Sequence, residues 1–447
     1  MLLLRKIIYR VYRLVTAVRY RVRRRFSRAG LAVLAGLFLT GAIGLDMEQT
    51  VAAQAFTLLV GLLVLAFAAS LRFRIRFSAA RSLPRYGTVG HPLAYRVVLR
   101  NETPSTQAGL ILLEDLADPR PTFEEFVAAQ TAEEKQARSF RVSRRASRLR
   151  FTRATVKEVP LPLLPPGQES EVQVELHPLK RGVLRFTGLT LARPDPLGLV
   201  KAYARLPLPQ SVLILPKRYP LPPIALPGAA RYQHGGVALA SSVGESEEFV
   251  AVRGYRRGDP LRHIHWRSWA KTGRPIVKEF EDEFFVRHAL ILDTFITHPN
   301  SEVFEEAVSV AASFACTVQT QESLLDLLFV GPQAYCFTAG RGVGHTEQML
   351  EVLASVQVCR ERNFDALEHL VLEHVEAVSG CICVLLAWDE RRQKFVEQLR
   401  ALGVPALVLV IAEAGGARMR DAGPLRDDPA SFHVLEVGAI AEGLAKL

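Results

Sequence analysis

Two uncharged stretches near the N-terminus read AGLAVLAGLFLTGAIGL (residues 29–45) and VAAQAFTLLVGLLVLAFAASL (residues 51–71). A helix needs roughly 20 residues to cross a hydrocarbon core of about 30 Å, so the second stretch is long enough and the first slightly short. Either stretch alone would also suit a helix buried in a soluble core. Because the two are close together between arginine-rich flanks, we predict a two-helix transmembrane hairpin over residues 29–71.

Basic residues flank this hairpin on both sides. Residues 1–28 contain ten Lys or Arg and no acid, residues 72–85 contain five more Arg, and the loop between the helices has no basic residue. Because Lys and Arg are retained on the cytoplasmic side, we predict a two-span protein of the cell (inner) membrane with cytoplasmic N- and C-termini. An organellar presequence would share the arginine-rich start, whereas a cleaved signal peptide does not fit a chain with a second span.

The basic flanks also account for the charge of the chain. Their fifteen Lys and Arg exceed the net charge of +11, so residues 86–447 carry a slight net negative charge. This balance does not support a basic, nucleic-acid-binding body. Residues 2–26 combine their arginines with Leu, Ile, Val and Tyr at near-helical spacing, which predicts a helix along the cytoplasmic headgroups.

The five cysteines are an odd number, which indicates reduced thiols in a cytoplasmic body. Cys381 and Cys383 have a spacing that would suit metal ligation. They lie in an apolar run, however, and small buried residues of a strand are the simpler interpretation.

Short apolar segments separated by turn residues fill residues 72–220. Six of them have the character of strands, and Asn101, Pro165-Pro-Gly167 and Arg181-Gly182 mark turns. The pattern predicts a β-sandwich of immunoglobulin-like type, interrupted by a charged insertion at residues 123–150. No catalytic group of residues is evident, so its expected role is a spacer or a binding module.

The most distinctive stretch lies in residues 221–280, which open with a proline-rich connector. It reads Glu248-Phe-Val-Ala-Val-Arg253-Gly-Tyr255-Arg-Arg-Gly258-Asp259-Pro-Leu-Arg262-His263-Ile-His265-Trp266, followed by Lys271 and Val277-Lys278-Glu279. This string resembles the signature of the family catalogued as domain of unknown function fifty-eight. Two upstream strings, Lys180-Arg-Gly182 and Asp195-Pro-Leu-Gly-Leu199, resemble shorter motifs of the same family.

Two interpretations of this signature block remain open. Its arginines alternate with acids, so ion pairs would staple the loop onto the following domain. We favour this structural role, in which Trp266 and Asp259 are buried, together with Arg253 and Arg262. Arg, Tyr and Trp also dominate interface hot spots, which would suit an exposed docking surface. The pair His263 and His265 lacks a third fixed ligand for a metal.

Residues 281–447 alternate strand and helix patterns. This order predicts a doubly wound α/β sheet with ligands at the carboxyl ends of its strands. It resembles a von Willebrand factor A-like domain, as the family resemblance also implies.

Von Willebrand factor A-like domains often hold Mg²⁺ with an Asp-x-Ser-x-Ser loop, a distant Thr and a distant Asp. The resemblance therefore implies Asp293 and Thr297 in the loop, with Thr346 and Asp389 as the distant pair. Phe295 stands where a hydroxyl ligand is expected and cannot coordinate an ion. We therefore predict no cofactor, with weak Mg²⁺ binding at most, and a role for Asp293 in capping the segment after it.

Two classes of function follow. The first is a non-enzymatic, membrane-tethered adaptor whose von Willebrand factor A-like domain docks a protein; the family resemblance implies a MoxR-type AAA+ ATPase as that partner. The alternative is a metal-dependent hydrolase that uses Asp293 and the His263/His265 region. Because no Ser/His/Asp order, Gly-rich phosphate loop or complete metal set is evident, we favour the adaptor.

The predicted topology can be tested with reporter fusions. A reporter fused after Leu447 is expected to behave as cytoplasmic, and one inserted between Met47 and Glu48 as external, because the basic flanks stay inside. Periplasmic behaviour of the C-terminal fusion would overturn this orientation.

Overall fold

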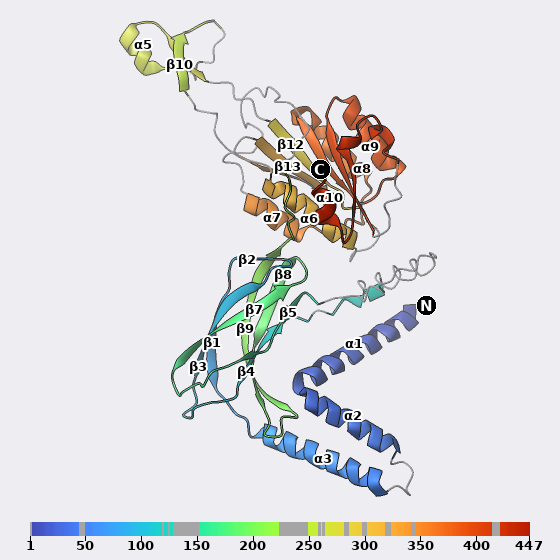
Figure 1. Cartoon of the computed structure of the whole chain (residues 1–447). Coiled ribbons are helices and arrows are strands. Elements are labelled where there is room, and N and C mark those ends of the chain that lie inside the picture. Colours follow the sequence, from blue (N-terminus) through green and yellow to red (C-terminus); the bar gives the residue numbers. More distant parts are fainter. Residues whose placement is uncertain are drawn as a thin grey trace. The chain divides into compact units, whose positions relative to one another are not determined.

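The computed structural model describes most of the chain, which divides into two compact units, Met1–Lys217 and Arg218–Leu447 (Figure 1). The described residues are 2–43, 50–118, 120–123, 126–127, 152–222, 249–257, 261, 264–280, 286–296, 302–317, 323–340, 346–413 and 421–447. Most of the insertion predicted at residues 123–150 therefore lies outside them.

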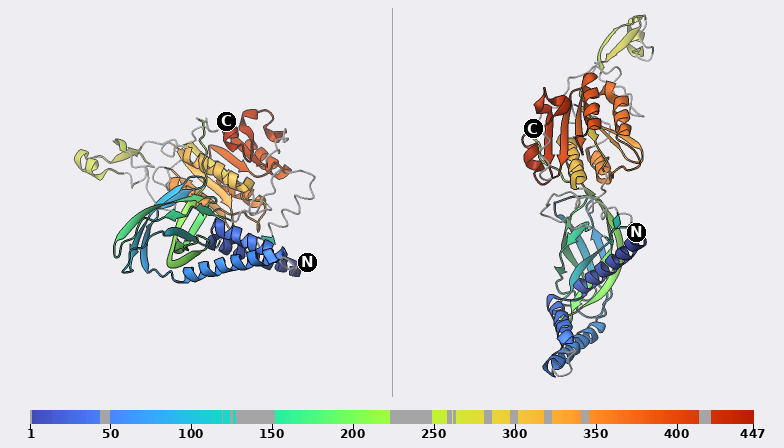
Figure 2. Two further views of the ribbon diagram at one scale, coloured as in Figure 1. Left: turned by 60° about the horizontal axis from the view of Figure 1, so that its bottom comes forward. Right: turned by 90° about the vertical axis from the view of Figure 1, so that its right-hand side faces the viewer.

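Three helices open the first unit: α1 (Leu2–Arg25), α2 (Arg28–Ile43) and α3 (Thr50–Leu71). By length and composition, Val51–Leu71 can cross a membrane, whereas the apolar helix over Arg28–Ala42 is shorter. Among the described residues, one helix thus has membrane-spanning length, and the second span stays a prediction. Figures 1 and 2 show α2 and α3 side by side.

Glycines allow α2 and α3 to approach each other closely. A Cβ on Gly36 would lie 3.3 Å from the side chain of Leu59, and one on Gly41 would lie 3.3 Å from that of Phe56. Small residues at such positions are typical of helix pairs in lipid, where packing rather than the hydrophobic effect holds helices together.

In the first unit, strands form two sheets around a shared core. One sheet has the order β1 (Phe77–Ser82), β3 (Leu93–Asn101), β7 (Glu169–Pro178), β5 (Ala154–Val156). The other has the order β2 (Tyr86–Thr88), β9 (Lys201–Leu215), β8 (Gly182–Pro194), β4 (Ile111–Leu116), β6 (Val159–Pro160). Both sheets contribute to one apolar cluster. This is the sandwich arrangement that the sequence predicted, and the immunoglobulin-like type stays a prediction.

Residues 184–186 and 189–191, which have the sequence pattern of two separate strands, belong to a single strand, β8. Its pairing with β9 shifts register between Phe186 and Gly188. A Cβ on Gly188 would lie 2.4 Å from the carbonyl oxygen of Leu206, so only glycine fits at this irregularity. The glycine that suggests a break in the sequence is therefore a bulge within one strand.

The Asp195-Pro-Leu-Gly-Leu199 motif holds the sandwich on the helices. The Asp195 carboxylate accepts the N–H groups of Leu197 at 2.9 Å and Val200 at 2.6 Å, which closes the loop. The carbonyl of Gly198 then accepts the Ser27 hydroxyl at 2.5 Å, and that of Leu199 accepts the Ser27 N–H at 3.0 Å. Leu199 and Val200 also pack with Ala66 of α3, so one short loop contacts both apolar helices.

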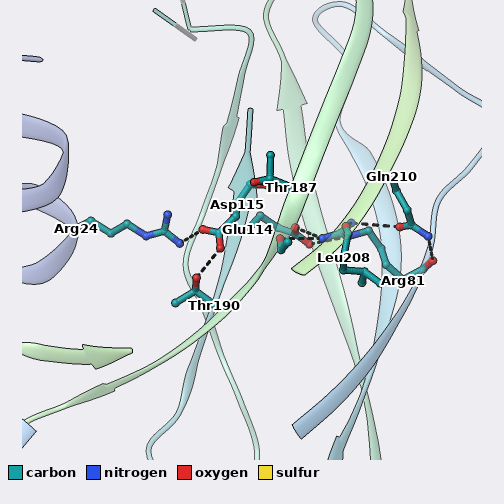
Figure 3. A network of polar contacts seen from close by, with 9 residues as sticks. Arg24, Arg81, Glu114, Asp115, Thr187, Thr190, Leu208 and Gln210 are labelled. Atoms are coloured by element: carbon teal, nitrogen blue, oxygen red, sulfur yellow. Dashed lines mark hydrogen bonds and ion pairs between the residues drawn. The ribbon is translucent and has the colours of Figure 1, made fainter. Parts of the chain in front are cut away.

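An ion pair lies buried between the sheets. Figure 3 shows Arg81 of β1 donating to Glu114 of β4, with Nη2 2.7 Å from Oε2, and to the Leu208 carbonyl. The side chains of Arg81 and Glu114 are 0% and 1% exposed. The guanidinium also donates to the Gly188 carbonyl and lies 4.5 Å from the ring centroid of Phe186. Every face of this charge therefore has a partner, as a buried ion requires.

The second unit contains a six-stranded sheet of the order β14 (Ala334–Ala339), β13 (Ser323–Val330), β12 (Val286–Leu292), β15 (Gly380–Leu385), β16 (Ala406–Ala412), β17 (Phe432–Glu436). All neighbours pair in parallel except β13 and β14. The predicted doubly wound sheet is confirmed. Cys381 and Cys383 lie buried in β15 as free thiols, and burial raises the pKa of Cys383.

Helices cover both faces of this sheet (Figure 1). On one face α8 (Asp365–His374) and α9 (Glu390–Ala401) pack over the cluster that contains Ile291 and Cys383. The remaining elements are α6 (Glu302–Thr317), α7 (Thr346–Ser355) and α10 (Ile440–Leu444). The sequence patterns did not predict α8, β17 or α10, because segments of five to ten residues are too short for a clear periodic signal.

The buried ion pair of the sandwich can be tested by removing one charge. Arg81→Met leaves Glu114 buried without its partner and is expected to lower the free energy of unfolding of the first unit by about 3–5 kcal/mol. Urea titration of the detergent-solubilised chain, followed by circular dichroism in the strand region, measures this loss.

Two controls accompany this test. All three tryptophans lie in the second unit, so the tryptophan fluorescence transition should not move. The double change Arg81→Met with Glu114→Leu should recover most of the loss. A double variant as unstable as the single one would show that the carboxylate is not the partner that matters.

Candidate functional site

The carboxyl ends of the central parallel strands meet around Asp293. This residue directly follows β12, which lies between β13 and β15. Its N–H donates to the Val384 carbonyl at 2.9 Å, which continues the pairing with β15. The strands that follow β12 in the chain lie first on one side of it (β13, β14) and then on the other (β15, β16, β17). Ligands of α/β proteins commonly bind where the strand order reverses in this way.

The Asp293 carboxylate is completely buried and has three donors. Oδ1 accepts the Phe295 N–H at 2.9 Å, and Oδ2 accepts the Leu386 N–H at 3.1 Å. The third donor is Nε of Arg392, 2.7 Å from Oδ2. The bond to Phe295 confirms that Asp293 caps the segment after it. The bond to Arg392 adds a full positive charge that the sequence analysis missed.

Arg392 joins Asp293 to Asp389. Its Nη1 lies 2.7 Å from Oδ2 of Asp389, and its side chain is only 7% exposed. Burial by itself lowers the pKa of Arg392, but Asp293 and Asp389 more than offset this effect and hold the pKa above its ordinary value. The guanidinium therefore stays charged and neutralises both carboxylates.

An aromatic wall completes this strand-end cluster. The guanidinium carbon of Arg392 lies 4.7 Å from the ring centroid of Phe364. The Phe364 ring meets Phe295 edge-on at 6.0 Å and Phe395 edge-on at 5.6 Å. Phe295 thus packs into the core beside α8 and α9. Aromatic faces stabilise a desolvated cation, so these rings favour the guanidinium in place.

Of the four predicted metal ligands, the structure brings two together, Asp293 and Asp389, because both bind Arg392. Asp293 and Asp389 bind the same guanidinium, Thr346 opens α7, and Thr297 lies outside the described residues. Within the described ranges, no group of three or more His, Cys, Asp or Glu side chains could hold a metal ion. A recognisable signal existed in the sequence: an Asp at a helix N-cap followed three residues later by Arg.

A second feature, the signature hairpin, carries the described part of the 248–280 block. Its strands β10 (Phe249–Gly254) and β11 (Ile276–Phe280) pair antiparallel, and the short helix α5 (Trp266–Thr272) connects to them. The Tyr255 N–H donates to Pro275, and the His265 N–H donates to Ile276. Ile264 and Val277 are buried together at a β-bridge.

Helix α5 contains two stacked tryptophans, of which Trp266 is exposed and Trp269 is half-buried. Trp266 is 65% exposed, and its ring stacks on that of Trp269 with centroids 5.2 Å apart and planes 17° apart. Nδ1 of His265 lies 2.6 Å from the Ser268 hydroxyl, which orders the first turn. Lys278 is half-buried. Exposed basic side chains surround the tryptophans in the sequence: Arg256, Arg257, Arg267, Lys271 and Arg274.

The expectation that Trp266 is buried is wrong. No residue of α5 is buried, and the two tryptophans cover each other because residues three apart lie on the same side of a helix. Arg253 donates from Nη1 to the Gly254 carbonyl at 3.3 Å. Five other residues of the signature block lie outside the described residues: Glu248, Gly258, Asp259, Arg262 and His263.

Both the strand-end cluster and most of the signature hairpin lie within a match to a known family. Residues 251–430 match the family described as Protein of unknown function DUF58. A curated relative, "Uncharacterized protein YeaD" of Bacillus subtilis (strain 168), is 29% identical over 184 residues, which are 40% of this chain and 44% of the relative. The chain therefore spans less than half the length of the relative that it matches.

Solved structures resemble the chain only distantly. The CARDB domain of the PF1109 protein from Pyrococcus furiosus has a TM-score of 0.17 and 11% identity, over 32% of this chain and 89% of that one. A β-glucosidase from Listeria innocua has a TM-score of 0.16 and 14% identity, over 31% of this chain and 16% of that one. Scores this low say nothing of function.

The DUF58 match contains the signature hairpin from Ala251 onward and the whole strand-end cluster through Arg392. The two features differ in character. The cluster is closed, with its charges paired, whereas the hairpin exposes large aromatic and basic side chains to solvent.

Arg392 is expected to exclude a divalent ion from the strand-end cluster. Titration calorimetry of the detergent-solubilised chain with Mg²⁺ or Mn²⁺ should show no saturable binding, because the guanidinium already neutralises Asp293 and Asp389. Arg392→Met should lower the free energy of unfolding of the second unit by about 3–5 kcal/mol, because Asp293 is left buried without a cation.

Arg391→Met is the matched control. The side chain of Arg391 is 65% exposed and lies 3.8 Å from Asp365, so its removal should change stability by less than about 1 kcal/mol. Micromolar Mg²⁺ affinity that disappears in Asp293→Ala would show that a metal, and not the arginine, occupies the cluster.

Proposed function

We propose that this protein is a membrane-tethered, non-enzymatic adaptor that binds a partner protein through the signature hairpin. In this proposal α2 and α3 both span the membrane, and the body after them is cytoplasmic. The body combines an immunoglobulin-like sandwich with a von Willebrand factor A-like domain. The observation that carries the proposal is the exposed side chain of Trp266, whose ring stacks on that of the half-buried Trp269.

Exposed tryptophans are costly to leave in water and are rare without a binding role. Trp and Arg are the residue types that contribute most to protein interfaces, where they fill desolvated pockets. The two stacked rings give a rigid apolar surface, since each limits the rotation of the other. The exposed charged side chains described around them are all basic, so an acidic rim around an apolar pocket would complement this surface.

The strand-end cluster supports a role without catalysis. A general base needs a carboxylate that can accept a proton from substrate, and Asp293 is buried and hydrogen-bonded to three donors. Freeing it would leave Arg392 unpaired in the core. The cluster is better suited to hold the loops at this end of the sheet in one conformation.

The sheet topology supports a von Willebrand factor A-like domain. The order β14-β13-β12-β15-β16-β17 has one antiparallel edge strand and an Asp at the end of its first strand. The family resemblance adds a MoxR-type AAA+ ATPase as the proposed partner. In this chain the arginine cluster would take the place of the metal that such domains often hold.

The adaptor role can be tested by capture of the purified MoxR-type ATPase from the same organism on the immobilised, detergent-solubilised chain. Trp266→Ala is expected to weaken capture by about thirtyfold or more, as for a hot-spot residue that contributes at least about 2 kcal/mol. Its stability should stay within about 0.5 kcal/mol of the parent, because the side chain is exposed.

Lys394→Ala is the surface control, since the Lys394 side chain is 66% exposed on α9 and lies far along the sequence from the hairpin. Capture that is unchanged by Trp266→Ala and by Trp269→Ala would place the docking surface elsewhere. A Trp266→Ala variant that unfolds early would instead support the structural interpretation of the block.

A further inference from the structure

One face of α1 is apolar and exposed. Its apolar residues recur at intervals of three and four, so they form one stripe along the helix. Leu3 and Leu14 are the most exposed of them, at 75% and 66%. The stripe consists of Leu3, Leu4, Ile7, Ile8, Val11, Leu14, Val15 and Val18.

The opposite face of α1 is bound to the described part of the segment that follows β4. The Tyr9 hydroxyl donates to the Pro121 carbonyl at 2.9 Å, and the Tyr9 ring packs on those of Phe123 and Phe126. Tyr12 packs on Phe126 as well. At 100° per residue, Tyr9 lies about 170° around the helix from the centre of the apolar stripe. The helix therefore has one face on protein and one apolar face that the described residues leave exposed.

An ion pair fixes the C-terminal end of α1. Arg24 pairs with Asp115 of β4, and Asp115 also accepts the Thr190 hydroxyl at 2.6 Å (Figure 3). Burial by itself lowers the pKa of Arg24, but Asp115 more than offsets it and raises the pKa above its ordinary value. Because α1 is held at Tyr9 and Tyr12 and again at Arg24, the stripe cannot turn inward without breaking these contacts.

Exposed arginines flank the stripe. At 100° per residue, Arg10 and Arg21 lie along one edge and Arg19 along the other. Residues 1–28 contain no acid that would offset them. A second copy of the same face would bring these like charges together, which opposes self-association. The complementary partner is an apolar surface with anionic groups at its boundary.

The position of α1 in the chain, directly before the apolar helices, indicates that this apolar surface with anionic groups is a lipid bilayer. The helix ends at Arg25, and the apolar helix α2 begins at Arg28. Between them, Ser27 is hydrogen-bonded to the Asp195 motif of the sandwich. If α2 and α3 enter a bilayer, the end of α1 is held within a few ångströms of the headgroups.

We propose that α1 binds the anionic phospholipid surface of the membrane. The apolar stripe inserts at the boundary of headgroups and acyl chains, and Arg10, Arg19 and Arg21 bind lipid phosphates. The helix then lies between bilayer and sandwich and sets the orientation of the sandwich on the membrane. This inference rests on the membrane tether of the proposed function and adds a lipid-binding site outside the spanning helices.

The test uses the full chain in nanodiscs of brominated lipid, where bromine quenches nearby tryptophan. Leu14→Trp adds a tryptophan to the stripe, and Tyr20→Trp adds one away from it at another exposed position of α1. The emission of the unchanged chain, whose tryptophans all lie in the second unit, is subtracted. Emission from Leu14→Trp should be lost in discs that contain phosphatidylglycerol, and emission from Tyr20→Trp should persist.

Charge is tested in the same discs. Replacing Arg10, Arg19 or Arg21 by Gln should weaken the surface-bound state by about fivefold for each charge removed. The phosphatidylglycerol content needed for quenching should rise accordingly, and added salt should act in the same direction. Equal quenching in discs of pure phosphatidylcholine would overturn the preference for anionic lipid.

Two other outcomes separate this inference from the tether itself. A chain that assembles into discs while Leu14→Trp stays unquenched at every lipid composition retains its tether and overturns the lipid-binding role of α1. A chain that does not assemble into discs at all overturns both.

Discussion

The ion pair between Asp293 and Arg392 organises the second unit. A carboxylate at the end of a central strand is removed from water, and it is stable there only with compensating donors and a counter-charge. Arg392 supplies the charge, and two backbone N–H groups supply the remaining donors. The same guanidinium binds Asp389 at the N-cap of α9 and lies on the ring of Phe364. One buried charge thus joins β12, the end of β15, the start of α9 and the aromatic wall.

Arginine and a divalent ion solve the same electrostatic problem differently. A metal ion exchanges with solvent and can bind a further ligand, so a metal site can open to a partner. A guanidinium is attached to the chain, donates in a fixed plane and stays charged at all ordinary pH values. In this chain the counter-charge is a side chain and cannot dissociate. The loops at the carboxyl ends of the strands are therefore held in one arrangement. In the proposed adaptor, binding to a partner then needs a different surface, and the exposed Trp266 of the signature hairpin is the surface that we propose.

The sandwich uses the same principle on both faces of one strand. Glu114 and Asp115 are neighbours on β4, so their side chains point in opposite directions. Glu114 points into the core, where it binds Arg81, and Asp115 points outward, where it binds Arg24 of α1 (Figure 3). Together with the Asp195 loop on Ser27, this arrangement transmits the position of the helices to the whole sandwich.

Local pattern was sufficient to predict several features of this chain. Uncharged runs bounded by arginines indicate the apolar helices, alternation over residues such as 171–176 indicates sandwich strands, and alternating strand and helix patterns indicate the doubly wound sheet. Each depends on residues close together in sequence. The remaining features depend on contacts between residues far apart. Asp293 and Arg392 are 99 positions apart, so only folding could reveal that an arginine pairs with the carboxylate that the family resemblance offered as a metal ligand. Trp266 is apolar and was expected to be buried, but α5 is a short helix whose tryptophans cover each other instead of a core. The sequence thus determined which segments are apolar and periodic, and only the tertiary structure decided which charge neutralises which and which aromatic rings remain in water.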